Sequence, residues 1–582
     1  MKRCPECRRD YYDDTLLYCL DDGNALLEGP ATARPANDEP ATAIFLVPPA
    51  IADDLTGATD EAELKTAILK PSATAGSSVP TRGFDKRLLL TPLALAIIVL
   101  SGFIGYRYFS DSSTKQINSI AVMPFENRNS DADTDYLSDG LAESVIFRLT
   151  QIADLKVSPT SSVMRYKGKE TDVAKIASEL GVDAVMTGRL TKRGDNLNIT
   201  VELVDARTNK SLWGEQYERK LSELLTTQRE IVTEIVGKLQ LKLSGESEQK
   251  LTKNYTVNNE AYQLYLQGRY QWNRRETKAF EKAVEFFKQA IAKDPNYALA
   301  YSGLADTYAL FPAYGNFRTK DYLPKAKEAA QKALELDPNL AEAHASLGQI
   351  LIYGEYDFAG GERSYKRSIE LNPKYATAHQ WYGELLFVSG RRDEAFKELS
   401  KALELDPFSM IINKEMRKFL LLARRFDEAL LQSKKVNELF PDEAEFHFTN
   451  AEIHELQGKY AEAFQEHILA AKIGGAKPEE IQEMQAIYEK GGWDGFIRAG
   501  QEQTLKSLND EQAKNKNEYV PAMRYVVIYA TLKDRDKTIE YLNKAFEENA
   551  LDMTYLNVDP LWDFVRDDLR FKELVRRVRF PE

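Results

Sequence analysis

The sequence predicts a multidomain chain in which an α/β sandwich domain precedes an α-helical solenoid, behind a short cysteine-containing tip and one transmembrane helix. Three observations predict this fold class. All three cysteines fall within the first twenty residues, an uncharged run covers 88–106, and X-Pro pairs recur through the second half at spacings of 43, 35, 34 and 34 residues. At 582 residues the chain is long enough for several domains.

The composition narrows the classes of function. Charged residues make up 29% of the chain and hydrophobic residues 43%, which is ordinary for globular domains. The net charge of −13 lacks the basic footprint of nucleic-acid-binding proteins, so a nucleic-acid partner is not expected. No cysteine follows Cys19, which excludes a disulfide framework in the rest of the chain. All five histidines lie between His344 and His467, so no histidine base or ligand precedes the repeats.

The tip, residues 1–24, carries the metal-like motif of the sequence. Cys4 and Cys7 form one close pair, and Cys19 with Asp22 forms the second, so the four side chains could hold a structural Zn²⁺ ion. The segment resembles a zinc ribbon in which the fourth cysteine is replaced, with Asp22, or less readily Asp21, completing the ligands. The alternative is three unliganded thiols in a flexible tail. Without metal, so short a segment could not sustain a core.

Residues 25–83 are rich in Ala, Pro, Thr and Asp and are predicted to be a disordered linker. The run 88–106 that follows is 19 residues long, which at about 1.5 Å per residue spans roughly the 30 Å hydrocarbon layer of a bilayer. Tyr106, Tyr108 and Phe109 form an aromatic boundary at its end. We therefore predict a single transmembrane helix.

Positive charge is greater before this span than after it. Four basic residues lie between Lys70 and Arg87, against Arg107 and Lys115 on the other side. The positive-inside rule then places the amino terminus in the cytoplasm. Residues after 106 are accordingly expected in the periplasm of a bacterium, with the span in the inner membrane.

Residues 117–245 alternate between strand-like and helix-like patterns. Strands are predicted at 118–125 and 155–160, helices at 135–153 and 173–181, the latter ended by Gly181. Residues 183–219 then read as a three-stranded meander, and a helix is predicted at 221–243. This pattern indicates an α/β domain of about 125 residues.

The stretches IAVMPFENRNSDADTDYLSDGLAESV, LGVDAVMTGRL and LVDARTNKSLWGEQYER of this domain resemble a TolB-like amino-terminal α/β domain. Such domains often precede tetratricopeptide repeats in bacterial multidomain proteins, including cyclases, kinases and membrane-bound winged-helix regulators. The resemblance implies a sensor or interaction module and no catalyst.

The 34-residue period indicates stacked helical repeats over residues 257–473, because a proline ends each helix and begins the next turn. The pattern of small and large residues resembles tetratricopeptide repeats. In one repeat it falls on Tyr382, Gly383, Leu386, Ala395, Leu399 and Ala402. The next repeat is degenerate, with Met416 and Arg417 where Leu-Gly is expected. Residues 474–582 are predicted to hold a degenerate helical repeat and a terminal cap, with a helix pair at 520–548.

The groove of such an array is predicted to be acidic. The resemblance carries the family's groove-facing positions onto Asp306, Glu342, Gln349, Gln380, Glu384, Phe387, Glu445, Phe448, Glu452 and Glu455, with Ser302 beside them. The basic residues there are Lys414 and Lys418. Phe387 and Phe448 are expected to be apolar anchors, so the groove would suit a basic or neutral peptide. The alternative is a solvated helix face.

Motifs for catalysis are missing from the sequence. No GxxxxGK[ST] or GxGxxG phosphate loop occurs, and no kinase or cyclase signature. His344, His379 and His447 are separated by 35 and 68 residues, one and two repeat periods, which indicates equivalent packing positions instead of a metal cluster. We therefore expect a non-enzymatic protein without a small-molecule substrate.

The leading hypothesis is a single-pass membrane protein that binds protein partners through its repeats, as a sensor or scaffold linked to the cytoplasmic zinc-ribbon-like tip. Two alternatives remain. One is an envelope-assembly scaffold, and the other is a membrane-bound transcription regulator.

Overall fold

The computed structural model describes residues 117–129, 132–169, 172–241, 243–441, 443–514 and 519–581, and three short strands nearer the amino terminus. The chain divides into two compact units, residues 1–105 and 106–582. In the first unit, β1 (Lys2–Arg3) pairs antiparallel with both β2 (Asp10–Tyr11) and β3 (Leu27–Glu28). The strand β3 belongs to the segment predicted as linker.

Several predictions fall outside the described residues. These are the zinc ligands Cys4, Cys7, Cys19 and Asp22, the remainder of the linker, and the transmembrane helix at 88–106. Within the described ranges, no helix combines the length and the apolar character needed to cross a membrane.

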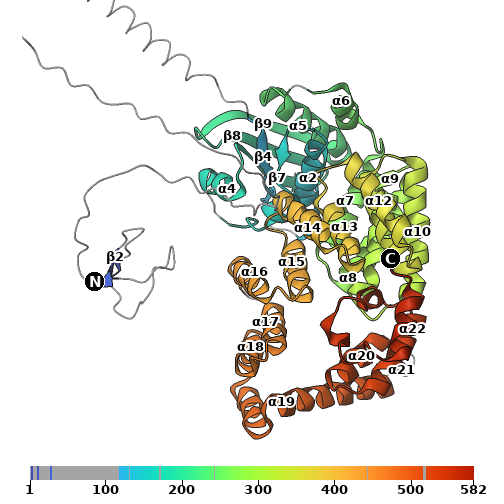
Figure 1. Ribbon diagram of the computed structural model, residues 1–582. Helices are drawn as coiled ribbons and strands as arrows, with labels where there is room; N and C mark the ends of the chain where they lie inside the picture. Colours follow the sequence, from blue (N-terminus) through green and yellow to red (C-terminus); the bar gives the residue numbers. More distant parts are fainter. Residues whose placement is uncertain are drawn as a thin grey trace, which may run out of the picture. The chain divides into compact units, whose positions relative to one another are not determined.

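The α/β domain is built on a mixed sheet (Figure 1). Its strands are β4 (Ser119–Val122), β5 (Glu126–Asn127), β6 (Lys156–Val157), β7 (Ala184–Arg193), β8 (Asn196–Asp205) and β9 (Lys210–Lys220). The order is β6-β4-β7-β8-β9, parallel from β6 to β7 and antiparallel from β7 to β9, and β5 pairs with β7. The predicted three-stranded meander is therefore confirmed.

Helices connect and cover these strands. They are α2 (Ala132–Thr150), α3 (Thr160–Met164), α4 (Val173–Leu180), α5 (Leu224–Lys238) and α6 (Gly245–Thr252). Strand β4 is buried along its whole length, as its continuous apolar run requires, and α2 contacts both β4 and β7. Gly181 ends α4 in the left-handed conformation, as predicted, with φ of 61°.

The second half consists of antiparallel helix pairs. They are α7 (Asn259–Asn273) with α8 (Thr277–Lys293), α9 (Ala298–Leu310) with α10 (Thr319–Leu336), α11 (Ala341–Glu355) with α12 (Phe358–Leu371), α13 (Ala376–Val388) with α14 (Arg392–Leu405), α15 (Met410–Leu422) with α16 (Phe426–Leu439), and α17 (Glu445–Leu456) with α18 (Tyr460–Ile473). The residue before each periodic proline is the non-helical C-cap of the second helix of a pair. This confirms the predicted solenoid.

Small residues allow the paired helices to approach closely. A Cβ atom on Gly268 or on Gly303 would lie 2.6 Å from the ring of Phe287, and one on Gly348 would lie 2.6 Å from Tyr365. In the degenerate repeat, Arg417 replaces the glycine and is buried, with its guanidinium donating to Thr449 Oγ1 at 2.8 Å. The larger side chain is accommodated because it points toward the next helix pair.

The predicted histidine positions are confirmed as packing positions. His344 and His379 each place Nε2 at 3.0 Å from the carbonyl oxygen of the preceding periodic proline. His379 and His447 also place Nδ1 at 2.6 Å from a glutamate of the paired helix. Among the described residues, no group of histidine, cysteine or acidic side chains is arranged to hold a metal ion.

The carboxyl-terminal region departs from the repeat period. It contains α19 (Pro478–Lys514), α20 (Ala522–Thr531), α21 (Arg535–Glu547), η3 (Leu551–Tyr555), η4 (Pro560–Trp562) and α22 (Leu569–Val578). The helix α19 is interrupted at Gly492, whose φ of 61° and ψ of −159° require glycine. The predicted helix pair at 520–548 corresponds to α20 and α21.

Substituting Gly348→Ala should lower the free energy of unfolding by about 1–3 kcal/mol, because the new methyl group would overlap Tyr365. Gly237→Ala in α5 is the matched control, since its Cβ would meet no atom within 4 Å and alanine favours the helix. The apparent midpoint of thermal unfolding of the full chain measures both. An equal or higher midpoint for Gly348→Ala would contradict the close approach.

Candidate binding face of the repeats

Helix α2 of the α/β domain packs on α7, the first helix of the first pair. The first helix of each pair is called the inner helix below. Gly140 allows the close approach, because a Cβ there would lie 3.0 Å from the Cβ of Leu266. Beside it, Arg269 Nε donates to Glu143 Oε1 at 2.8 Å, and the Tyr262 hydroxyl donates to Ser144 Oγ at 2.9 Å. The sheet domain and the repeats are therefore joined by both close packing and charge.

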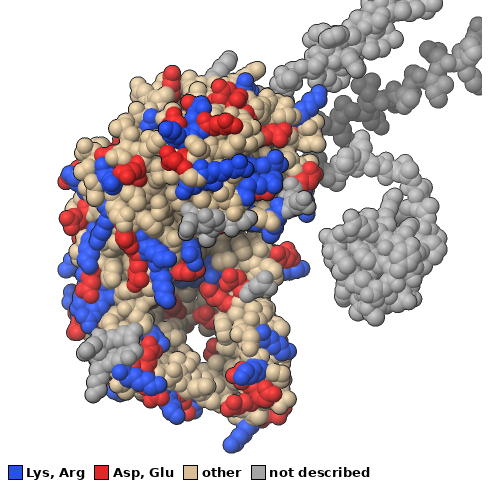
Figure 2. All heavy atoms as spheres, turned by 180° about the vertical axis from the view of Figure 1, so that it is seen from behind, with Lys and Arg blue, Asp and Glu red and all other residues tan. Residues whose placement is uncertain are grey.

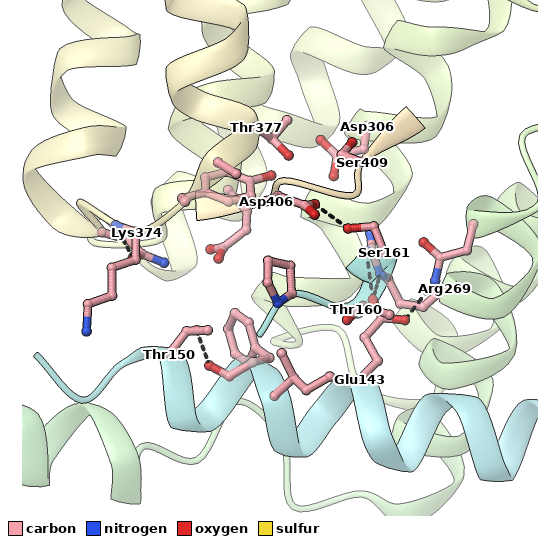
Figure 3. A pocket seen from close by; sticks show the side chains of 18 of the residues that line it. Glu143, Thr150, Thr160, Ser161, Arg269, Asp306, Lys374, Thr377, Asp406 and Ser409 are labelled. Carbon is pink, nitrogen blue, oxygen red and sulfur yellow. Dashed lines mark hydrogen bonds and ion pairs between the residues drawn. The ribbon is translucent and has the colours of Figure 1, made fainter. Parts of the chain in front are cut away.

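A second contact lies three to four repeats further on, at the two ends of the pair α13 and α14. The Lys374 ammonium donates to the carbonyl oxygens of Ile152 at 3.0 Å and Leu155 at 2.9 Å, just beyond the carboxyl end of α2, where a cation is favourable. Ser162 Oγ donates to Asp406 Oδ1 at 2.8 Å, and Ser161 also donates to Asp406 (Figure 3). Burial raises the pKa of the Asp406 carboxyl.

These two contacts bracket a cavity of about 1320 Å³ between the α/β domain and the inner helices α7, α9, α11, α13 and α15 (Figure 3). Aromatic side chains from both parts line it, among them Phe147, Tyr255, Tyr262, Tyr265, Trp272, Tyr297, Tyr314, Tyr375 and Trp381. Its size is above the range of ordinary small-molecule pockets, so it can admit a peptide segment.

Two carboxyl groups on successive inner helices face this cavity. Asp306 on α9 is 4% exposed and accepts a hydrogen bond from Ser346. Burial raises the pKa of Asp306 to about 6, against the lowering effect of that hydrogen bond and of Arg269. Burial likewise raises the pKa of Glu342 on α11 to about 7. Both groups are therefore poised to ionise near neutral pH, a property common at functional sites.

Two arginines also line the cavity, Arg269 in α7 and Arg275 just beyond the end of that helix. Arg269 is committed to Glu143 and lies 4.3 Å from the centre of the Trp272 ring. Arg275 lies over the same ring at 3.7 Å and donates no side-chain hydrogen bond to a described residue. Ser302 Oγ is buried at the cavity wall, again without a hydrogen-bond partner among the described residues. The cavity thus retains polar groups that a ligand could satisfy.

The structure separates the predicted groove residues into three groups. Asp306, Glu342 and Gln380 line the cavity, together with Ser302. Glu384 accepts hydrogen bonds from Tyr353 at 2.5 Å and from Tyr555 of the carboxyl-terminal region. Gln349 accepts from Tyr365 at 2.5 Å, within its own helix pair. Asp306, Glu342 and Gln380 thus form the first group, which faces the cavity, and Glu384 and Gln349 form the second, whose side chains are bonded to tyrosines of the chain.

Phe387 corrects the prediction of a groove anchor. Its side chain is fully buried and stacks on Phe419 of α15 at 4.3 Å between ring centres. A ring placed between neighbouring inner helices fills the space that separates them, so it belongs to the core and cannot meet a ligand.

The third group lies on α17. Glu445 is paired with Lys414 at 2.5 Å, and Phe448 is 50% exposed, with its ring 5.6 Å from that of His467. Glu452 is exposed, and Glu455 accepts from Trp493 Nε1 at 3.4 Å. Figure 2 shows acidic side chains beside the hollow in this lower part of the molecule. Phe448 therefore remains available as an apolar anchor.

Sequence reasoning missed the arginines and the covering of the face. Glu143 and Arg269 are 126 residues apart and belong to different predicted domains, so no local pattern pairs them. The predicted groove positions begin on α9. The same repeat offsets on α7 mark its inner face, but they do not indicate which segment packs on it.

Comparisons with known proteins agree with this division. A family model described as HilA/YgeH-like transcriptional regulator, second domain, matches residues 115–234, and one described as tetratricopeptide repeat matches residues 356–409. Together with the observed helix pairs, the second match shows that the chain contains tetratricopeptide repeats. The resemblance to a TolB-like domain remains a prediction.

Two curated relatives cover only part of the chain. The chain is 31% identical over 237 residues to Putative adenylate cyclase 3 of Rhizobium meliloti, covering 40% of each. It is 25% identical over 293 residues to Transcriptional regulator HilA of Salmonella typhimurium, covering 50% of this chain and 51% of HilA. The chain thus matches about half or less of the length of these relatives.

Two solved structures similar to the chain are described as TPR proteins. TTC0263, a TPR protein of Thermus thermophilus, is 20% identical to this chain. The match covers 33% of this chain and 98% of TTC0263, with a TM-score of 0.29. YrrB, described as a TPR protein with an unusual peptide-binding site, is 21% identical to this chain. The match covers 32% of this chain and 91% of YrrB, with a TM-score of 0.24.

The buried carboxyl of Asp306 predicts a pH-dependent stability. Its pKa is 3.8 when unperturbed and about 6 when folded, so the folded state binds more protons and stability falls as pH rises through this window. Asp306→Asn mimics the protonated form. It should therefore stabilise the protein at about pH 8 by up to roughly 3 kcal/mol, with a much smaller effect at about pH 4. Thermal unfolding of both proteins across this range tests the sign, and a gain at pH 4 that disappears at pH 8 would refute it.

Proposed function

We propose that this chain is a membrane-anchored, non-enzymatic tetratricopeptide-repeat protein that senses or scaffolds a protein partner, with a basic or neutral segment of that partner entering the cavity between the α/β domain and the repeats. The single observation that carries the proposal is the cavity of about 1320 Å³, lined by Asp306 and Glu342 and by aromatic rings. Carboxylates beside aromatic faces favour ammonium and guanidinium groups. Tetratricopeptide repeats suit protein–protein interaction.

The proposed arrangement in the cell follows the sequence. The amino-terminal tip would bind a structural Zn²⁺ ion in the cytoplasm, residues 88–106 would cross the inner membrane, and the α/β domain and repeats would lie in the periplasm. The adenylate cyclase relative spans the chain only in part, so its name carries no activity to this chain. A signalling role agrees with both curated relatives, whose names are those of a cyclase and a transcription regulator.

A membrane-bound transcription regulator is the second candidate. The match of residues 115–234 to the second domain of HilA/YgeH-like regulators favours it. In that case the response to a bound partner would be regulation of transcription, and the net charge of −13 indicates that nucleic-acid contact would need another protein or a local basic surface.

Peptide binding tests the cavity. Labelled peptides of about 12 residues, one lysine-rich, one neutral and one glutamate-rich, are titrated into the full chain in detergent. The lysine-rich and neutral peptides should bind. The double variant Asp306→Asn, Glu342→Gln should weaken the lysine-rich peptide about tenfold or more, because charge-assisted bonds are lost.

Glu455→Gln is the matched control for these titrations, since this glutamate lies on α17 outside the cavity. Equal binding of all three peptides would refute the selectivity. Unchanged affinity in the double variant would show that the peptide binds elsewhere.

Metal content and fractionation test the tip and the span. The purified full chain should contain about one Zn²⁺, and Cys4→Ser with Cys7→Ser should remove it. Deletion of residues 88–106 should move the protein from the membrane fraction to the supernatant. Zinc-free protein, or membrane binding that survives the deletion, would refute the respective part of the proposal.

A further inference from the structure

One end of the cavity is formed by the last turn of α7 and the residues that follow it. Trp272 belongs to that last turn, and Arg275 lies two residues beyond Asn273, where α7 ends. The backbone of Arg275 is left-handed, with φ of 55°, and turns the chain from α7 into α8. Its guanidinium lies 3.7 Å from the centre of the Trp272 ring, and both residues line the cavity. The fold therefore holds a cation at this end.

The Arg275 guanidinium carries five N–H donors, and none of them reaches an acceptor among the described residues. Burial lowers the pKa of Arg275, and the neighbouring Arg269 lowers it further, whereas Asp306 counteracts both effects. A guanidinium removed from water without hydrogen bonds is costly, so an anion that bonded to it would bind favourably.

The acidic side chains around this end of the cavity are already engaged. Glu143 accepts hydrogen bonds from two side chains of α7, at 2.8 Å each. Glu276 pairs with Arg274 at 3.3 Å. Asp306 accepts from a serine of α11, and in the described structure it attracts Arg275 without forming an ion pair with it. The described chain therefore leaves the donors of Arg275 to a group from outside.

The position of Arg275 suits a carboxylate. A guanidinium that lies over an aromatic ring keeps its N–H donors at its edge, where two of them can bond to the two oxygens of a carboxylate. Since Arg275 lines the cavity, a ligand can reach it without displacing a described part of the fold. Asp306 and Glu342 face the same cavity from α9 and α11, so the cavity offers acidic groups to a base and one cation to an acid.

We propose that Arg275 is a carboxylate-binding subsite of this cavity, so that a carboxylate of the partner's segment binds the guanidinium while a basic side chain of the same segment binds at Asp306 and Glu342. The inference rests on the proposed entry of a partner segment into the cavity. The carboxylate can be the terminal group of the segment or an acidic side chain, and the experiment separates these two sources.

Three forms of the lysine-rich peptide test the subsite. The first ends in an amide, the second ends in a free carboxylate, and the third ends in an amide but has glutamate as its next-to-last residue. Each is titrated by fluorescence anisotropy into the full chain in detergent. At least one carboxylate-bearing form should bind about tenfold more tightly than the plain amide, because it gains a charge-assisted bidentate bond. The form that does so identifies the source of the carboxylate.

Substitution of the arginine assigns this preference to its guanidinium. Arg275→Gln should abolish the advantage of the carboxylate-bearing peptide, and Arg275→Lys should keep only part of it, because lysine retains the charge but not the planar fork. Arg424→Gln is the matched control. Arg424 has the equivalent left-handed position after α15, with φ of 60°, but it pairs with Asp563 and does not line the cavity.

The outcomes separate this inference from the proposed function. If the three peptides bind equally and the double variant Asp306→Asn, Glu342→Gln still weakens them, the subsite does not exist and the proposed function stands. If the double variant has no effect but Arg275→Gln abolishes a carboxylate preference, the subsite stands and the acidic selectivity fails. No binding of any peptide overturns both.

Thermal unfolding shows whether Arg275 instead holds the fold together. Arg275→Gln should leave the midpoint close to that of the unmodified chain, since its guanidinium bonds to no described acceptor. Arg269→Gln should lower the midpoint, because it leaves Glu143 buried without its partner. An equally large fall for Arg275→Gln would show that the side chain has a structural role, and would overturn the subsite.

Discussion

Arg269 and Glu143 form an ion pair in which the two side chains are 19% and 15% exposed, and the cavity depends on it. An isolated charge at either position would be costly to bury, so each residue stabilises the protein only while the other is in place. The pair holds α2 against α7 at the point where Gly140 lets the helices approach. The space left beyond this contact, between α3 and the inner helices, is the cavity with its aromatic walls.

The same face of the repeats is used three times along its length. The α/β domain contacts the repeats from α7 as far as Asp406, the turn at Tyr555 contacts Glu384 on α13, and α17 leaves Phe448 exposed. Because the chain itself covers much of this face, acidic side chains at the groove positions do not indicate an open groove. Asp306 and Glu342 face a cavity, whereas Glu384 already has two tyrosine hydroxyls bound.

Local chemistry made the elements predictable. A proline removes a backbone donor and fixes φ, so the ends of the helices before Pro295 and Pro373 follow from the sequence alone. Gly181 and the repeated histidines are predictable for similar reasons. Contacts between distant segments cannot be predicted in this way. Nothing in the sequence near Glu143 indicates Arg269, and nothing near Tyr555 indicates Glu384, because the curvature of the solenoid brings each pair together. Phe387 shows the same limit, since its place in the core depends on Phe419 in the next repeat.

The contacts of the carboxyl-terminal region with α11 and α13 have a consequence for how the protein loses its structure. An open repeat array is nearly one-dimensional, and it frays from its free end because the last unit has one neighbour. Here the last segment returns to the middle of the array, so its loss exposes residues of two inner repeats as well as its own. The terminal helices and the central repeats are therefore expected to melt as one cooperative unit, and a fault near Tyr555 would weaken helices about 200 residues earlier in the chain.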